Sequence, residues 1–232
     1  MWNVFHRLLL VSFGLFFMAG CATVYVPNSA HTNMMSEKGE LHASVQLGTQ
    51  GGDIMLGYAL SDQFGLVGSY SGSEEFQNGE QTGSHDYGEA ALVFFPQIKG
   101  PVQAEFLGGI GFGNAMGESS ILGVDRIVEG DYSRPFLQGN LSVNTTSFFR
   151  AGVATRFAHV NFTNLESTAD LTGLDTSALF FEPTAFVQLG RGLFRVESQF
   201  GISEPMFKSI DDLAFEHEPV RFSIGARFLF NL

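Results

Sequence analysis

The feature that most constrains the fold is a strict alternation of apolar and polar residues near the end of the chain. In VRFSIGARFLF (220–230), one face carries Val220, Phe222, Ile224, Ala226, Phe228 and Phe230. Alternation with a period of two places successive side chains on opposite sides of a β-strand. The two arginines of this segment lie on the other face. The segment is therefore predicted to be a strand that separates an apolar environment from a polar one.

Nine further segments resemble this strand in length and pattern. They are LHASVQLG (41–48), DIMLGYAL (53–60), FGLVGSYSG (64–72), YGEAALVFF (87–95), VQAEFLGGIGFG (102–113), RPFLQGNLSVN (134–144), FFRAGVATRFAHV (148–160), ALFFEPTAFVQLG (178–190) and LFRVESQFGIS (193–203). A tilted strand needs about 9–11 residues to cross a membrane, and most of these segments have them. The 28 glycines disfavour helices, at about 1 kcal/mol each in a helix interior. A lipid-facing surface also accommodates the 25 phenylalanines more readily than a single soluble core does.

The connections between these segments alternate in length. The short ones are 61–63, 96–101, 145–147 and 191–192, the long ones are 73–86, 114–133, 161–177 and 204–219, and the first connection, 49–52, is short where the series predicts a long one. Outer-membrane barrels have short periplasmic turns, longer extracellular loops and an even number of antiparallel strands. We therefore predict an all-β fold over residues 41–232, a transmembrane antiparallel up-and-down β-barrel of about ten strands, with eight as an alternative. A soluble β-sandwich is the competing fold, but it would carry more charge opposite its apolar face.

Most of the excess negative charge, −12 for the whole chain, lies in the four long connections. Acidic extracellular loops repel nucleic acid and attract cations. The alternation places a second set of charges on the lumen side of the strands. They are Arg150, Arg156, Arg195, Arg221, Arg227, Glu89, Glu105, Glu182 and Glu197. Because buried charges need partners and a barrel of this size is narrow, we predict an ion network that fills the lumen.

The chain begins with a short segment containing Arg7, followed by twelve uncharged residues, LLLVSFGLFFMA (8–19). Such a run is too short to span a bilayer and is typical of a secretory signal peptide. Its end, Met18-Ala19-Gly20-Cys21, resembles the bacterial lipobox. That resemblance implies that residues 1–20 are removed and that Cys21, the only cysteine, carries lipid. We expect residues 21–40 to form a lipidated tether outside the barrel.

Several residues resemble parts of active sites. His85-Asp86 and Asp211-Asp212 are the residue types of a rim-mounted protease, but neighbours on a strand point to opposite faces. His159 and Ser147 lie at opposite ends of one segment, and Glu216-His217-Glu218 lacks a nearby second histidine for a metal site. We predict no catalytic residues, no metal site and no cofactor. An outer-membrane protease or a lipid A-modifying enzyme remains the alternative.

Three stretches, CATVYVPN (21–28), SEKGELHASVQLGTQGGDIMLGYALSDQFGLVGSYSG (36–72) and FSIGARFLFNL (222–232), resemble small lipid-anchored outer-membrane barrels of Bacteroidota. The resemblance implies an architecture and supplies no catalytic residues. We expect a location in the cell outer membrane, with both termini periplasmic because the strand number is even. The expected partners are outer-membrane lipid and lipopolysaccharide, the barrel-assembly and lipoprotein-sorting machinery, and an outer-membrane complex partner, but not nucleic acid. The expected role is structural or that of a complex subunit, and the alternative is a barrel that binds or transports a ligand or cation.

Overall fold

The computed structural model describes residues 23–49, 51–78, 81–121, 124–168, 174–208 and 216–232, which form β-strands and their connections. The strands are β1 (Thr23–Tyr25), β2 (Glu40–Gly48), β3 (Gly51–Ala59), β4 (Phe64–Asn78), β5 (Gln81–Phe94), β6 (Val102–Ile121), β7 (Val124–Asn144), β8 (Phe149–Ser167), β9 (Leu174–Arg191), β10 (Phe194–Ile202), β11 (Glu204–Lys208), β12 (Glu216–His217) and β13 (Val220–Asn231). Within these ranges no helix is long and apolar enough to cross a membrane.

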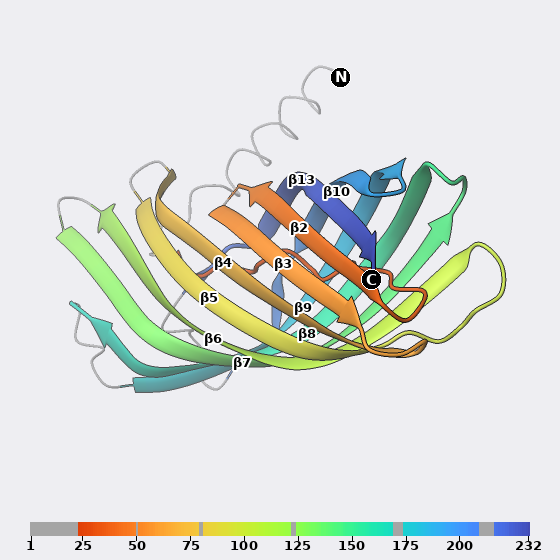
Figure 1. Ribbon diagram of the computed structural model, residues 1–232. Helices are drawn as coiled ribbons and strands as arrows, with labels where there is room; N and C mark the ends of the chain where they lie inside the picture. The colour runs from red at the N-terminus through yellow and green to blue at the C-terminus, as the bar shows by residue number, and fades with distance from the viewer. Residues whose placement is uncertain (1–22, 50, 79–80, 122–123, 169–173, 209–215) are drawn as a thin grey trace, which may run out of the picture.

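Ten of these strands form a closed antiparallel barrel. The strands from β2 to β10 each pair with the next along the chain, β10 pairs with β13, and β13 closes the barrel by pairing with β2. Strand β11 continues beyond β10 along β9, and β1 pairs in parallel with β12. The prediction of an all-β up-and-down barrel is confirmed, with ten strands rather than eight (Figure 1).

Three hairpins are much longer than the sequence indicated. The described parts of segments 73–86, 114–133 and 161–177, all expected as loops, are mostly strand. Strand β4 pairs with β5, β6 with β7 and β8 with β9 almost to their tips. In these extensions the apolar side chains, among them Ala115, Val128 and Tyr132, face inward and the outward side chains are mostly polar, so the outward apolar pattern ends before the strand does. Strands of 20 and 21 residues exceed the roughly 9–11 needed to cross a bilayer, so these hairpins extend beyond it. We call this side of the barrel the hairpin end, and the side with the short connections and Leu232 the turn end.

The barrel has an apolar exterior and a polar interior. Leu92 is 65% exposed and Phe106 is 56% exposed on the outside, whereas Arg134 and Arg227 are fully buried in the lumen. A soluble sandwich would bury the apolar set instead. The surface therefore has the polarity of a transmembrane barrel, in which hydrocarbon solvates the outward side chains.

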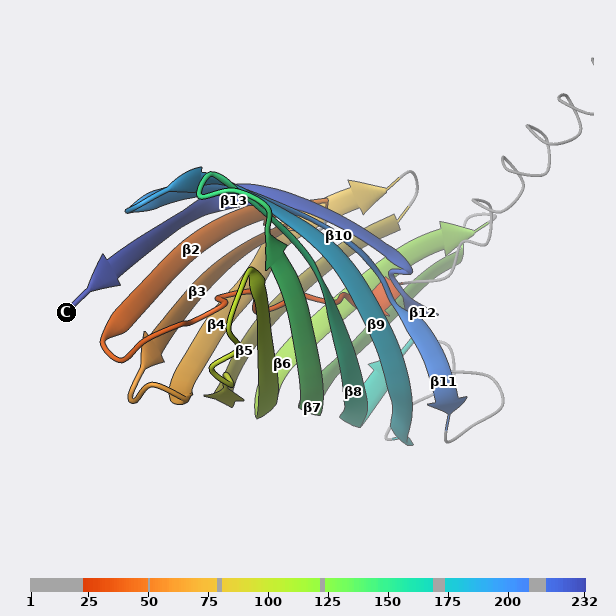
Figure 2. The same cartoon turned by 90° about the vertical axis from the view of Figure 1, so that its right-hand side faces the viewer.

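The N-terminal part of the described chain runs inside the barrel. This differs from the prediction that residues 21–40 form a tether outside it. Residues 25–35 are all buried, and we call them the lumen segment. Figure 2 shows this segment crossing the barrel interior from β12 to the start of β2. At the turn end, the Leu232 N–H donates to the carbonyl of Gly39. The described chain therefore starts at the hairpin end, opposite the C-terminus, which differs from the expected placement of both termini on one side.

Candidate functional site in the barrel lumen

The centre of the lumen is organised around one buried carboxylate. Glu89 of β5 lies 2.8 Å from Arg134 Nη2 and 3.4 Å from Arg156 Nη2, which come from β7 and β8. From the lumen segment, Asn28 Nδ2 donates to Glu89 across 2.8 Å, and His31 Nε2 lies 2.9 Å from it. Charged groups removed from water require such partners, so this cluster binds the lumen segment to three strands of the wall.

A second carboxylate lies nearer the turn end. Arg227 of β13 donates from Nε and Nη2 to Glu197 of β10, at 2.9 and 2.8 Å. Thr32 of the lumen segment donates its hydroxyl to the other oxygen of Glu197 at 2.6 Å. Gln188 and Gln199 add hydrogen bonds of 2.6 Å to this carboxylate. The carboxylate thereby joins β9, β10 and β13 to the lumen segment.

Two further contacts fix the hairpin-end half of the lumen segment. Asp53 of β3 forms an ion pair with Arg221 of β13 at 3.3 Å, and both contact Ser29. Tyr25 donates its hydroxyl to Glu182 of β9 at 2.6 Å. Because wall strands on all sides contribute partners, the lumen segment is anchored along its length.

All nine charged residues predicted to face the lumen line it, but they differ in their partners. Glu105 accepts the backbone N–H of Met35 at 2.7 Å rather than pairing with an arginine. Arg150 and Arg195 have no carboxylate within 4.0 Å among the described residues. Arg134 and Asp53, which take part in the ion pairs, were missed. Each is the first residue of its predicted strand segment, so it was treated as the strand boundary. Each nevertheless lies an odd number of residues from the outward-facing side chains of its strand, as the other lumen residues do.

The lumen closes differently at its two ends. At the hairpin end, Tyr25 packs against Phe180 with ring centroids 4.6 Å apart, and Tyr87 stacks on Tyr132 at 5.5 Å, within a buried apolar cluster. At the turn end, a cavity of about 490 Å³ remains. It is lined by Asn144, Thr146, Ser147, Phe149, Arg150 and Arg195. We call it the turn-end cavity.

His85 is the enzyme candidate with the most suggestive neighbours. Its ring nitrogens lie 3.2 and 3.0 Å from the hydroxyls of Ser71 and Ser73, inside the lumen. Asp86 is exposed on the outside, where Tyr70 donates to it, so the two neighbours face opposite sides of the strand. The cavity beside His85 measures about 10 Å³, which holds at most a water molecule and no substrate.

The other candidates do not come together. His159 is exposed on the exterior, whereas Ser147 lines the turn-end cavity. His217 Nε2 donates to the Ser203 carbonyl at 3.1 Å, and its ring packs on Phe180. Asp211 and Asp212 lie outside the described residues. Within the described ranges, no three histidine, cysteine, aspartate or glutamate side chains are grouped to hold a metal ion.

Comparisons with known proteins find similarity of shape alone. No protein-family model and no curated protein matches the chain. Among solved structures it is similar to LpxR from Salmonella typhimurium, with 8% identity and a TM-score of 0.41 over 82% of this chain and 100% of that chain. It is also similar to a loop L8 deletion mutant of OmpT, an outer membrane protein of Vibrio cholerae, with 9% identity and a TM-score of 0.28 over 83% of this chain and 97% of that one. At these values the similarity assigns neither a residue nor a reaction to this chain.

Proposed function

We propose that this protein is an outer-membrane β-barrel lipoprotein with a structural or complex-subunit role, and that its own lumen segment closes the barrel to solutes. The observation that carries this proposal is the complete burial of residues 25–35, which are hydrogen-bonded to the surrounding wall. A conducting barrel needs a continuous water-lined passage. Here the aromatic cluster at the hairpin end and the Glu89 network occupy the positions that such a passage requires.

The apolar exterior supports a location in the outer membrane, and the extended hairpins give the protein a surface on which a complex partner can bind. The position of Thr23 bears on the lipid at Cys21. Two residues of extended chain span at most about 7 Å, so a lipid on Cys21 would be attached close to Thr23. This supports an acyl anchor on the hairpin side of the barrel. If the long hairpins face outward, as in bacterial barrels, the lipid belongs to the cell-surface leaflet.

Planar bilayer recordings test closure of the lumen. We expect the purified full-length protein to insert without steady single-channel currents, while a general porin conducts in the same bilayer. A variant that lacks residues 25–35 should conduct if it folds, because a ten-stranded barrel is slightly wider than the kind that side chains alone fill. Steady currents from the wild-type protein would contradict the proposal whether or not the variant folds.

Thiol labelling on intact cells tests the orientation and the anchor together. Glu166 is exposed at the hairpin end and Lys99 at the turn end, so each is suited to replacement by cysteine. A membrane-impermeant maleimide should label Glu166→Cys in intact cells, and Lys99→Cys only after permeabilisation. The wild-type protein should remain unlabelled even when denatured, because transfer of a diacylglyceryl group converts the Cys21 thiol to a thioether.

Two different results would contradict the proposed lipid at Cys21 and the proposed orientation of the barrel, each independently of the other. Labelling of the denatured wild-type protein would exclude the lipid at Cys21. Labelling of Lys99→Cys before Glu166→Cys would reverse the orientation of the barrel and leave the lipid assignment intact.

A further inference from the structure

The turn-end cavity contains two arginines that share one neutral partner. Arg150 Nη1 donates to Gln188 Oε1 at 3.0 Å, and Arg195 Nη1 donates to the same oxygen at 3.3 Å. Arg150 Nε also donates to Asn144 Oδ1 at 2.7 Å. The two guanidinium groups are thereby brought together from β8 and β10 by an amide that carries no charge.

This pair differs from the other lumen arginines. Arg134, Arg156, Arg221 and Arg227 each lie within 3.4 Å of a carboxylate. No described carboxylate lies within 4.0 Å of Arg150 or Arg195, although Arg150 is only 6% exposed. The Nε atom of Arg195 is buried and has no hydrogen-bond partner in the described part of the chain. Two adjacent, partly desolvated cations without a counterion favour an anion in the space beside them.

The cavity has the size and the hydrogen-bond donors for such an anion. Its volume of about 490 Å³ falls within the roughly 300–1,000 Å³ typical of ligand pockets. Thr146 Oγ1 accepts the backbone N–H groups of Phe148 and Phe149 at 3.2 and 3.0 Å. These bonds fix the hydroxyl in the turn and leave its proton free to donate toward a bound anion.

We propose that the turn-end cavity is a binding site for a phosphate group, held between Arg150 and Arg195. The planar donors of arginine match phosphate oxygens in pairs, and a phosphomonoester dianion balances both positive charges, whereas a single carboxylate balances one. A phosphomonoester group is presented by the headgroup of phosphatidic acid and by a soluble phosphomonoester such as glycerol 3-phosphate. The site does not depend on closure of the lumen by residues 25–35, since none of these residues lines the turn-end cavity.

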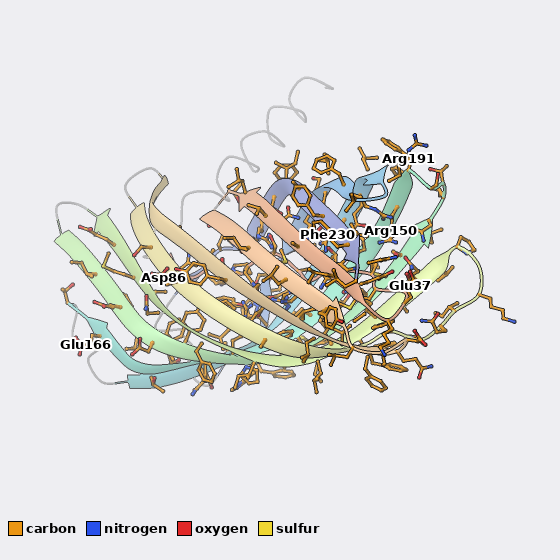
Figure 3. All side chains as sticks on the ribbon, viewed as in Figure 1. Glu37, Asp86, Arg150, Glu166, Arg191 and Phe230 are labelled. Carbon is orange, nitrogen blue, oxygen red and sulfur yellow. The ribbon has the colours of Figure 1, made fainter. Side chains whose placement is uncertain are left out.

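Calorimetry on the full-length protein in a non-ionic detergent tests the site, with glycerol 3-phosphate as the soluble probe. Nanodiscs that contain phosphatidic acid, compared with nanodiscs of phosphatidylcholine alone, supply the lipid probe, with retained lipid measured by native mass spectrometry. Arg150→Gln and Arg195→Gln should each weaken binding about tenfold or more. Arg191→Gln removes the same charge from the same end of the barrel but from outside the cavity lining, so it should leave binding within about twofold (Figure 3).

Each outcome is decisive. Arginine-dependent binding of glycerol 3-phosphate assigns the site to a soluble ligand, and arginine-dependent retention of phosphatidic acid alone assigns it to a lipid headgroup. The proposal is overturned if neither probe binds to the wild-type protein, or if Arg191→Gln weakens binding as much as Arg195→Gln does. Circular dichroism of each variant confirms that the barrel is folded.

Discussion

Replacing Glu89 with glutamine is expected to destabilise the folded barrel by about 3–5 kcal/mol, the usual cost of removing one partner from a buried ion pair. The carboxylate is fully buried and lies within 3.4 Å of both Arg134 and Arg156. Glutamine keeps the shape of the side chain but leaves two buried guanidinium groups without a counterion. The measurement is the urea midpoint of unfolding in phospholipid vesicles, followed by far-UV circular dichroism.

The matched control for this variant is Glu166→Gln. Glu166 is exposed on β8 beyond the apolar belt, so the same change of charge should alter the free energy of unfolding by no more than about 0.5 kcal/mol. In a double variant, Glu89→Gln with Arg156→Gln, the free energy of unfolding should fall by less than the sum of the decreases in the two single variants, because the two groups interact directly. Equal destabilisation by Glu89→Gln and Glu166→Gln would show that the lumen network does not stabilise the barrel.

Gly225→Ala is expected to impair closure of the barrel. Gly225 of β13 pairs with Gln46 of β2, where the last strand meets the first. A Cβ atom at this position would collide with the carbonyl oxygen of Val45 and lie 2.8 Å from Gln46 Cα. The backbone of a closed sheet can shift only slightly to relieve this collision. We therefore expect the free energy of unfolding to fall by roughly 3 kcal/mol and the amount of folded protein to fall several-fold. The measurement is the fraction that migrates as a compact, heat-modifiable band in electrophoresis.

Gly139→Ala in β7 controls for the general effect of replacing a strand glycine. Its Cβ would lie 3.9 Å from the nearest atoms, on the Phe106 ring, which is ordinary van der Waals contact. This variant should fold as well as the wild-type protein. If Gly225→Ala and Gly139→Ala give the same folded yield, the tight approach between β2 and β13 is not required for closure.

The exterior of the barrel could be predicted from individual segments. The alternation of Phe222, Ile224 and Phe228 with Arg221 and Arg227 assigns each residue to a face before any pairing is known. A strand has only two faces, and the apolar one must meet hydrocarbon or a core. Strand number and antiparallel order followed from the spacing of these segments. The ends of the hairpins did not, because beyond the membrane the outward apolar stripe ends and the buried apolar side chains face inward instead.

The lumen contents could not be predicted in the same way. Asn28, Ser29, His31 and Thr32 lack periodicity and have the composition of a linker. Their role as lining partners depends on Glu89, Asp53 and Glu197, which lie on strands distant in the sequence. The site of the unpaired Arg150 and Arg195 likewise appears only once β8, β9 and β10 are placed side by side.

Local side-chain alternation was enough to define which faces of the strands meet lipid, because that property depends on each strand and its solvent alone. The path of residues 25–35 through the barrel, and the opposite positions of Thr23 and Leu232, depend on which distant charges need partners within one enclosed space. These charges are buried, and so require partners, only when the sheet has closed into a barrel.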